Sequence, residues 1–228
     1  MPRDVGVVIV AGGKGERLGT AIAKQYLLLA GSPVLLHAIR PFASHPDVAH
    51  VVIVLPAADV DAPPQWLADI KSQSLTLVGG GTHRSDSVAA GLATLPASCG
   101  LVLVHDGARP FPPRDVLDAS IAVARTGHSA VPALPVGETI KRADDYGRIL
   151  ATVPRDGLWR AQTPQSFPRL VLERAHAAGR ADGIIATDDA SLVERIGETV
   201  ELIAGSVRNI KITTADDLAL AEWMAGRA

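Results

Sequence analysis

The chain has 228 residues and lacks most of the features that assign a protein to a special class. Its one cysteine, Cys99, cannot form an internal disulfide and has no cysteine or histidine partners at a zinc-site spacing. No activating base is evident beside it, so we expect a buried structural thiol. No apolar run approaches the roughly 20 residues of a membrane span. The N-terminus lacks the apolar core of a signal peptide, so we expect a cytoplasmic protein without a membrane partner.

Excess charge and aromatic residues are also missing. The net charge is −2 at pH 7, which argues against a general nucleic-acid-binding protein, since such proteins are strongly basic. Aromatic residues make up 4% of the chain and hydrophobic residues 47%, so we expect a core of Val, Leu, Ile and Ala. A chain of this length suits one α/β domain, and we predict a single domain over residues 1–228.

Short apolar runs alternate with helical periodicities over the first 131 residues. A continuous apolar run bounded by glycine or proline is typical of a parallel strand buried on both faces. We predict strands at 5–10, 51–55, 75–78 and 101–104, and helices at 34–42, 63–70, 85–95 and 116–124. Parallel strands joined by helices form right-handed units, so this half predicts a mostly parallel, Rossmann-like α/β sheet flanked by helices. Ligands of such sheets bind beyond the carboxyl ends of the strands.

Regular structure returns near the C-terminus. We predict helices at 168–178 and 188–196 and a strand at 199–203. Gly179 is expected to close the first of these helices, and Thr187 to cap the second. Thr214 and Asp217 have the spacing of a capping box, which predicts the start of a terminal helix.

Between these two regular parts, residues 132–167 contain only short extended pieces. We predict a protruding β-arm at about 135–162, with residues 144–147 as its hairpin turn. A hairpin outside the main sheet is marginally stable unless something packs against it. A second copy of the chain is the natural partner, so we expect a homodimer joined partly through the arm. An arm folded back on its own domain is the alternative.

The first strand leads into a glycine-rich, basic loop that reads Ala11-Gly12-Gly13-Lys14-Gly15-Glu16-Arg17-Leu18-Gly19, with Lys24 shortly after. Glycines let backbone N–H groups approach an anion closely, and Lys14, Arg17 and Lys24 add full positive charge. This combination suits a triphosphate. The spacing matches neither a dinucleotide-binding fingerprint nor a P-loop. An ordinary glycine turn between a strand and the next element is the alternative on this stretch alone.

Two more strand ends carry suggestive loops. Residues 79–87 read Gly-Gly-Gly-Thr-His-Arg-Ser-Asp-Ser, and their glycines would let a flat base lie against the backbone. Arg84 in this loop could pair with Asp86. Residues 105–110 read His-Asp-Gly-Ala-Arg-Pro and place Asp106 at the end of a strand. A hard cation carried in by a nucleotide needs only one or two protein oxygens, although Asp106 could equally start a turn.

Taken together, these motifs resemble those of the sugar-phosphate nucleotidyltransferases. Lys24-Gln25-Tyr26 resembles one branch, the 2-C-methyl-D-erythritol 4-phosphate cytidylyltransferases, and the match continues through residues 105–110, 162–165, 187–189 and 209–213. The chain departs from the family pattern in four places. Gly12 and Gly107 stand where alanine is usual, Thr82 where some members have an acidic residue, and Gly137-Glu138 where a basic-acidic pair is common.

The resemblance implies a reaction of CTP with 2-C-methyl-D-erythritol 4-phosphate that releases pyrophosphate, in the non-mevalonate isoprenoid precursor pathway. It implies catalytic roles for Arg17, Lys24, Arg155 and Lys211. Nucleotide-binding positions would be Ala11, Gly12, Gly13, Gly80, Gly81, Ser87, Asp106 and Gly107. The methylerythritol phosphate would meet Thr139, Arg155, Thr163, Thr187 and Lys211, with Thr139 and Arg155 reaching into the partner subunit. Asp106 would hold Mg²⁺ or another divalent cation.

Two other functions stay open on the sequence. A cytidylyltransferase for ribitol 5-phosphate would have nearly the same nucleotide half. A nucleotide sensor without catalytic activity could share the fold, since fold alone does not fix function.

Overall fold

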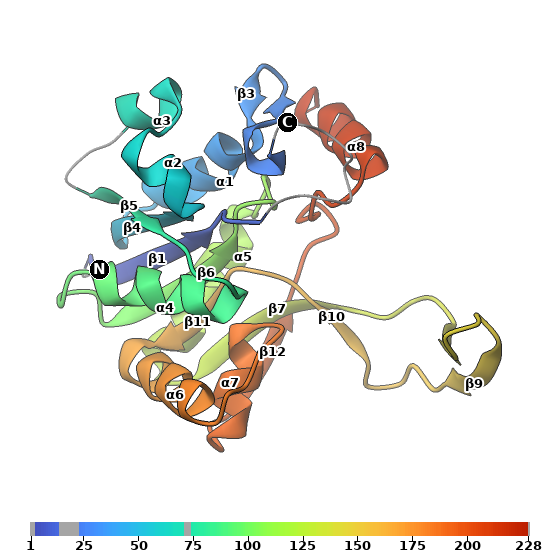
Figure 1. Cartoon of the computed structure of the whole chain (residues 1–228). Coiled ribbons are helices and arrows are strands. Elements are labelled where there is room, and N and C mark those ends of the chain that lie inside the picture. Colours follow the sequence, from blue (N-terminus) through green and yellow to red (C-terminus); the bar gives the residue numbers. More distant parts are fainter. Residues whose placement is uncertain (1–2, 14–22, 71–73, 228) are drawn as a thin grey trace.

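The centre of the structure is a mixed, mostly parallel sheet with helices on both faces (Figure 1). The structure is a computed structural model that describes residues 3–13, 23–70 and 74–227. Eight strands of the described residues form the sheet, in the order β10-β7-β11-β6-β1-β4-β5, with β12 also paired to β7. These strands are β1 (Val5–Val10), β4 (Val48–Leu55), β5 (Leu75–Gly79), β6 (Leu101–Asp106), β7 (Ser129–Pro135), β10 (Trp159–Ala161), β11 (Gln165–Pro168) and β12 (Val200–Ala204). The predicted fold class is confirmed.

The parallel half of the sheet is buried on both faces. β1 pairs in parallel with β4 and β6, and β4 pairs in parallel with β5. On one face, alternate residues such as Val7 and Ile53 pack against α1 (Val34–Ala43) and α5 (Arg114–Arg125). On the other face, Val8 and Val52 pack against α4 (Arg84–Thr94), α6 (Arg169–Ala181) and α7 (Asp189–Arg195). This double burial explains why the strands have continuous apolar runs.

The other half of the sheet contains antiparallel pairs. β11 lies between β6 and β7 and is antiparallel to both. β11 was not predicted from the sequence, because the strand is short and begins with the polar residues Gln165 and Ser166. The Ser166 hydroxyl is buried and donates to the carbonyl of Ser120 in α5 at 2.9 Å, so tertiary contacts hold this strand in place. β7 also runs on to Pro135, beyond the predicted end of regular structure.

Several helix boundaries differ from the prediction. The helix predicted at 63–70 is present as the shorter α3 (Gln65–Asp69), whereas α2 (Ala57–Asp61) was not predicted. α6 runs through Gly179, which was expected to close it. A Cβ on Gly179 would lie 2.7 Å from Leu192 Cδ2, so the glycine lets α7 pack closely. Asp188, and not Thr187, caps α7.

The C-terminal helix and the cysteine agree with the prediction. α8 (Ala215–Ala225) begins with the predicted capping box of Thr214 and Asp217. It rests on the small hairpin of β2 (Leu28–Leu29) and β3 (Ser32–Pro33) through an apolar cluster that includes Leu29 and Ala221. Cys99 is buried in the core, where burial raises the pKa of its thiol. Among the described residues, no helix has the length and apolar character needed to cross a bilayer.

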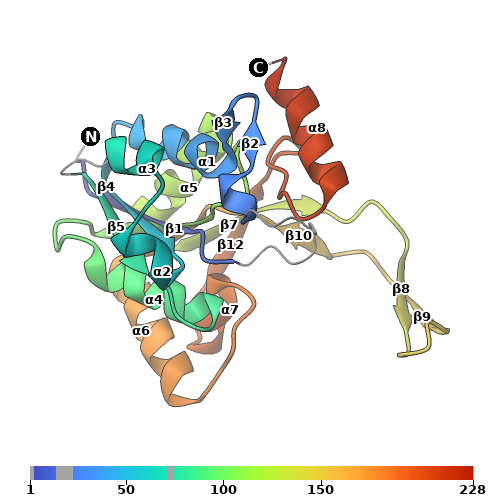
Figure 2. The same cartoon turned by 45° about the horizontal axis from the view of Figure 1, so that its top comes forward.

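The β-arm projects away from the body of the molecule in two views (Figures 1 and 2). β8 (Ile140–Ala143) and β9 (Ile149–Val153) form an antiparallel hairpin, and β7 pairs with β10 at the base of the arm. The predicted turn at 144–147 is present, with Gly147 at a φ of +77° and Asp144 accepting the backbone N–H groups of Tyr146 and Arg148. The arm therefore does not fold back on its own sheet.

Candidate active site

A pocket opens beyond the carboxyl ends of β1 and β6, where the sequence predicts ligand binding. Its cavity volume is about 220 Å³. It is lined by Val10, Ala11, Gly12, Gly13, Lys24, Gln25, Gly81, Thr82, His83, Arg84, Ser87, Asp106, Gly107, Ala108 and Lys211. All but one of the predicted nucleotide-binding residues lie on this wall. The remaining one, Gly80, precedes Gly81 and donates its backbone N–H to the carbonyl of Leu55 at 2.8 Å.

Two glycines of the pocket wall, Gly81 and Gly107, allow a close approach of neighbouring atoms. A Cβ on Gly81 would lie 2.4 Å from the Cβ of Asp86, and one on Gly107 would lie 3.1 Å from the Cβ of Ala11. Gly12 differs, because a Cβ there would meet only ordinary contacts of 3.8 Å or more. The alanine that is usual in the family at the Gly12 position would thus fit.

Asp106 lies in the pocket among three cations. Its Oδ2 is 2.7 Å from Lys211 Nζ and 3.9 Å from Arg109 Nε, and its Oδ1 is 3.4 Å from Arg84 Nε. The residue is 8% exposed. Burial raises the pKa of Asp106, but the charges of Arg84, Lys211 and Arg109 outweigh burial and hold this pKa far below its usual range. The carboxylate is therefore ionised at neutral pH.

A buried hydrogen-bond chain holds Asp106 from behind. The backbone N–H of Asp106 donates to Thr163 Oγ1 at 3.1 Å, and Thr163 Oγ1 lies 3.0 Å from His105 Nδ1. His105 Nε2 donates to the carbonyl of Arg109 at 3.0 Å, so Nδ1 is the acceptor and the ring is neutral. Burial lowers the pKa of His105 to about 4. Thr163 was predicted to contact the methylerythritol phosphate. It is buried, and its hydroxyl is hydrogen-bonded to both the Asp106 N–H and His105 Nδ1.

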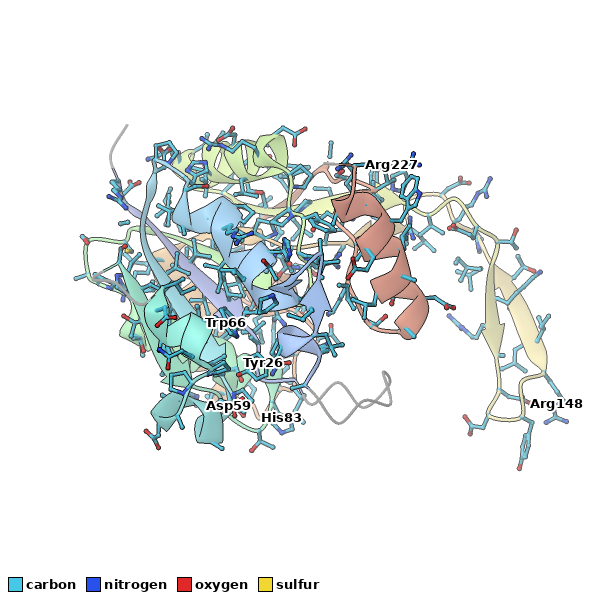
Figure 3. All side chains as sticks on the ribbon, turned by 90° about the horizontal axis from the view of Figure 1, so that it is seen from above. Tyr26, Asp59, Trp66, His83, Arg148 and Arg227 are labelled. Atoms are coloured by element: carbon cyan, nitrogen blue, oxygen red, sulfur yellow. The ribbon has the colours of Figure 1, made fainter. Side chains whose placement is uncertain are left out.

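Lys24 lies on the 3₁₀ turn η2 (Lys24–Tyr26), which Tyr26 anchors (Figure 3). The Tyr26 hydroxyl donates to Asp59 Oδ2 at 2.7 Å, and its ring packs edge-on against Trp66 with centroids 6.5 Å apart. Burial and Asp59 raise the pKa of Tyr26, so this donor stays protonated. Lys24 is thereby held at the pocket. Arg17 and Lys14 lie outside the described residues.

The predicted acceptor residues are not all in this pocket. Thr139 and Arg155 are exposed on the arm, where Arg155 Nη1 donates to the carbonyl of Gly137. Thr187 is exposed and lines a separate open hollow with Ser191 and Arg195. Only Lys211 of the predicted acceptor residues lines the wall that contains Asp106.

The role of Arg84 was not predicted from the sequence. Arg84 pairs with Asp106 and Asp189, whereas its expected partner Asp86 accepts the backbone N–H of His83 at 3.0 Å. Gln25 was also overlooked: its side chain is buried at the pocket wall, and both of its amide atoms lack a hydrogen-bond partner among the described residues. Its position next to Lys24 in the sequence was the signal that could have placed Gln25 at the pocket.

Glycine-rich strand ends and an enclosed carboxylate with cations around it, on a Rossmann-like sheet, are typical of a nucleotidyltransferase. The sequence profile of 2-C-methyl-D-erythritol 4-phosphate cytidylyltransferase matches residues 5–227. Enzymes of that description from Syntrophotalea carbinolica and Geobacter metallireducens are 42% and 40% identical over 222 and 220 residues. These alignments cover 96% and 94% of this chain, and 95% and 94% of the two relatives.

Solved structures agree. The crystal structure of 2-C-methyl-D-erythritol 4-phosphate cytidylyltransferase from Thermus thermophilus superposes with a TM-score of 0.82 at 35% identity, covering 98% of this chain and 99% of that one. The chain belongs to the family of 2-C-methyl-D-erythritol 4-phosphate cytidylyltransferases, nucleotidyltransferases of the non-mevalonate pathway. The resemblance seen in the sequence is confirmed.

Proposed function

We propose that this pocket binds CTP and that the protein transfers the cytidylyl group to 2-C-methyl-D-erythritol 4-phosphate. An acceptor phosphate oxygen attacks the α-phosphorus of CTP, the bond from that phosphorus to the bridging oxygen breaks, and pyrophosphate leaves. The products are 4-diphosphocytidyl-2-C-methyl-D-erythritol and pyrophosphate. The observation that carries the proposal is the position of Lys24, Arg84 and Lys211 on the wall of the pocket that contains the carboxylate of Asp106.

The chemistry needs no general base. The second pKa of a phosphate monoester is about 6, so the attacking oxygen already has its charge at neutral pH. The main obstacle is the repulsion between two highly negative molecules. Fixed cations and backbone N–H groups lower that barrier by neutralising charge and by alignment. We assign this role to Lys24 and Lys211, and we retain Arg17 as a predicted third cation from the glycine-rich loop.

The donor set of the pocket fits Mg²⁺. Mg²⁺ in nucleotide sites is usually held through one or two carboxylates, with substrate phosphates and waters completing the shell. Asp106 offers one ionised carboxylate, and the described residues contain no cluster of three or more metal-binding side chains. Asp106 would therefore hold the ion, whose charge would help to neutralise the phosphates.

The arm supplies the remaining residues in a homodimer. Thr139 and Arg155 lie on an arm that extends away from its own body, and their proposed ligand is the acceptor phosphate in the partner's pocket. Arg forks onto a phosphate with paired hydrogen bonds, and a threonine hydroxyl adds another. Ile149 and Leu150 on β9 are 65% and 63% exposed, which a partner surface would cover. Thr187, on the loop before α7, is the proposed contact of the acceptor within the same subunit.

The test is release of pyrophosphate from CTP with each of two acceptors, 2-C-methyl-D-erythritol 4-phosphate and ribitol 5-phosphate. We expect turnover only with the first acceptor and only when Mg²⁺ or a similar divalent cation is added. Faster turnover with ribitol 5-phosphate would replace the proposed substrate. No release with either acceptor would reject the proposed activity.

A further inference from the structure

Asp189, the first residue of α7, is one of the most completely enclosed charges among the described residues. It is 1% exposed. Its Oδ2 accepts a hydrogen bond from Arg84 Nη1 at 2.6 Å, and its Oδ1 lies 3.0 Å from His176 Nε2 in α6. Burial raises the pKa of Asp189, but Arg84 and His176 outweigh burial and lower it. A buried, ionised carboxylate is costly to desolvate, and the contacts with Arg84 and His176 offset this cost.

Arg84 connects this carboxylate to the pocket. One guanidinium contacts Asp189 through Nη1 at 2.6 Å and Asp106 through Nε at 3.4 Å. A guanidinium is a rigid planar fork, so fixing one nitrogen also fixes the direction of the others. The shorter contact is to the more deeply buried carboxylate. Asp189 is therefore the anchor that orients Arg84, and it keeps Arg84 from closing fully onto Asp106.

The side chain of Gln165 holds the start of α7. The backbone N–H of Asp189 donates to Gln165 Oε1 at 3.2 Å, and Gln165 Nε2 donates to Asp188 Oδ2 at 2.7 Å. Thr187 immediately precedes this clamped pair. Asp189 thus ties the loop that contains Thr187 to the guanidinium that faces Asp106.

We propose that Asp189 is a positioning residue. Through Arg84, it fixes the position of the nucleotide pocket relative to the loop before α7 that contains Thr187. The inference rests on the proposed roles of Asp106 and Thr187. Asp189 would thus affect the binding of both substrates, although it does not line the pocket. Without the carboxylate of Asp189, Arg84 would be free to move closer to Asp106, and the start of α7 would lose its link to Arg84 and His176.

The test compares Asp189→Asn with Asp118→Asn. Asp118 has the same kinds of partner, His45 at 2.9 Å and Arg114 at 3.0 Å, but lies on α5 outside the pocket lining. We expect Asp189→Asn to raise the KM for CTP and the KM for the acceptor at saturating CTP about tenfold each, while Asp118→Asn leaves both within twofold. An Asp189→Asn protein that melts at a lower temperature with both KM values unchanged would make Asp189 merely structural.

A second variant keeps the test decisive if Asp189→Asn does not fold. Arg84→Lys keeps the positive charge and loses the fork, so it can reach only one of the two carboxylates. We expect Arg84→Lys to raise the acceptor KM as well as the CTP KM, and CTP affinity measured by calorimetry to fall in parallel. A rise confined to CTP would overturn the proposed link between the two sites. Failure of the wild-type protein to release pyrophosphate would instead reject the proposed function, so the two failures are distinguishable.

Discussion

Lys211 Nζ lies 2.7 Å from the Oδ2 of Asp106, and this contact brings a residue near the C-terminus to the end of β6. The side chain of Lys211 is 40% exposed, whereas that of Asp106 is 12% exposed. The lysine is thus accessible to an incoming phosphate, whereas the carboxylate is largely enclosed. The pair joins the proposed cation-binding residue to one of the proposed phosphate-binding residues.

The first prediction concerns Lys211. We expect Lys211→Gln to lower kcat for pyrophosphate release by about 10²–10³, the usual cost of losing a preorganised group that stabilises transition-state charge. Lys211→Arg keeps the charge and should retain much more activity. Arg208→Gln, which removes a nearby exposed cation outside the pocket, is the control. Normal turnover in Lys211→Gln would remove Lys211 from the proposed mechanism.

The second prediction concerns Thr163. Thr163→Val keeps the shape but leaves the Asp106 N–H without its buried acceptor, so we expect unfolding free energy to fall by about 1–3 kcal/mol. We also expect kcat to fall because Asp106 is displaced. Thr163→Ser keeps the hydroxyl and should behave like the wild type in both chemical denaturation and turnover. A variant with normal stability and normal kcat but a raised acceptor KM would show that Thr163 acts through direct contact with the acceptor.

The third prediction is a pH dependence caused by His105. Its folded pKa of about 4 lies below the roughly 6.5 of an unfolded histidine, so the unfolded chain binds more protons between these values. Stability is therefore present at pH 7 and is lost as pH falls from about 6.5 toward 4, by an amount on the order of 3 kcal/mol. We expect His105→Gln to flatten this part of the melting-temperature profile. An unchanged profile in His105→Gln would show that His105 does not cause this loss of stability.

Burial decided which parts of the fold could be predicted from the sequence. β1, β4 and β6 are enclosed on both faces, so their sequences are apolar throughout and are recognisable. β11 is held by its neighbours and not by its own pattern, and it was missed. Gly179 was predicted to end a helix, since glycine often does so. Its actual role is the tight contact with Leu192, which lies on a later helix and could not be seen in the local sequence.

The residues of the site also fall into those that could be predicted from the sequence and those that could not. The loops after β1 and β6 were predicted because the carboxyl ends of parallel strands meet at one edge of a sheet. The contact between Arg84 and Asp189 could not be predicted, because these residues are 105 positions apart and only the packing of α4 near α7 brings them together. Local spacing favoured Asp86, which instead caps its own helix.

The last prediction tests whether the arm completes the partner's site. Arg155→Ala should leave a subunit with an intact pocket and a defective arm, and Lys211→Ala the reverse. When the two inactive variants are unfolded, mixed in equal amounts and refolded, half of the dimers are mixed, and each mixed dimer has one intact site. We therefore expect recovery of about a quarter of wild-type activity. Recovery requires each arm to act on the other subunit, because an arm that serves its own pocket leaves every site with one defect. Refolding each variant alone is the control, and mixed refolding without recovered activity would mean that Arg155 does not act across a dimer.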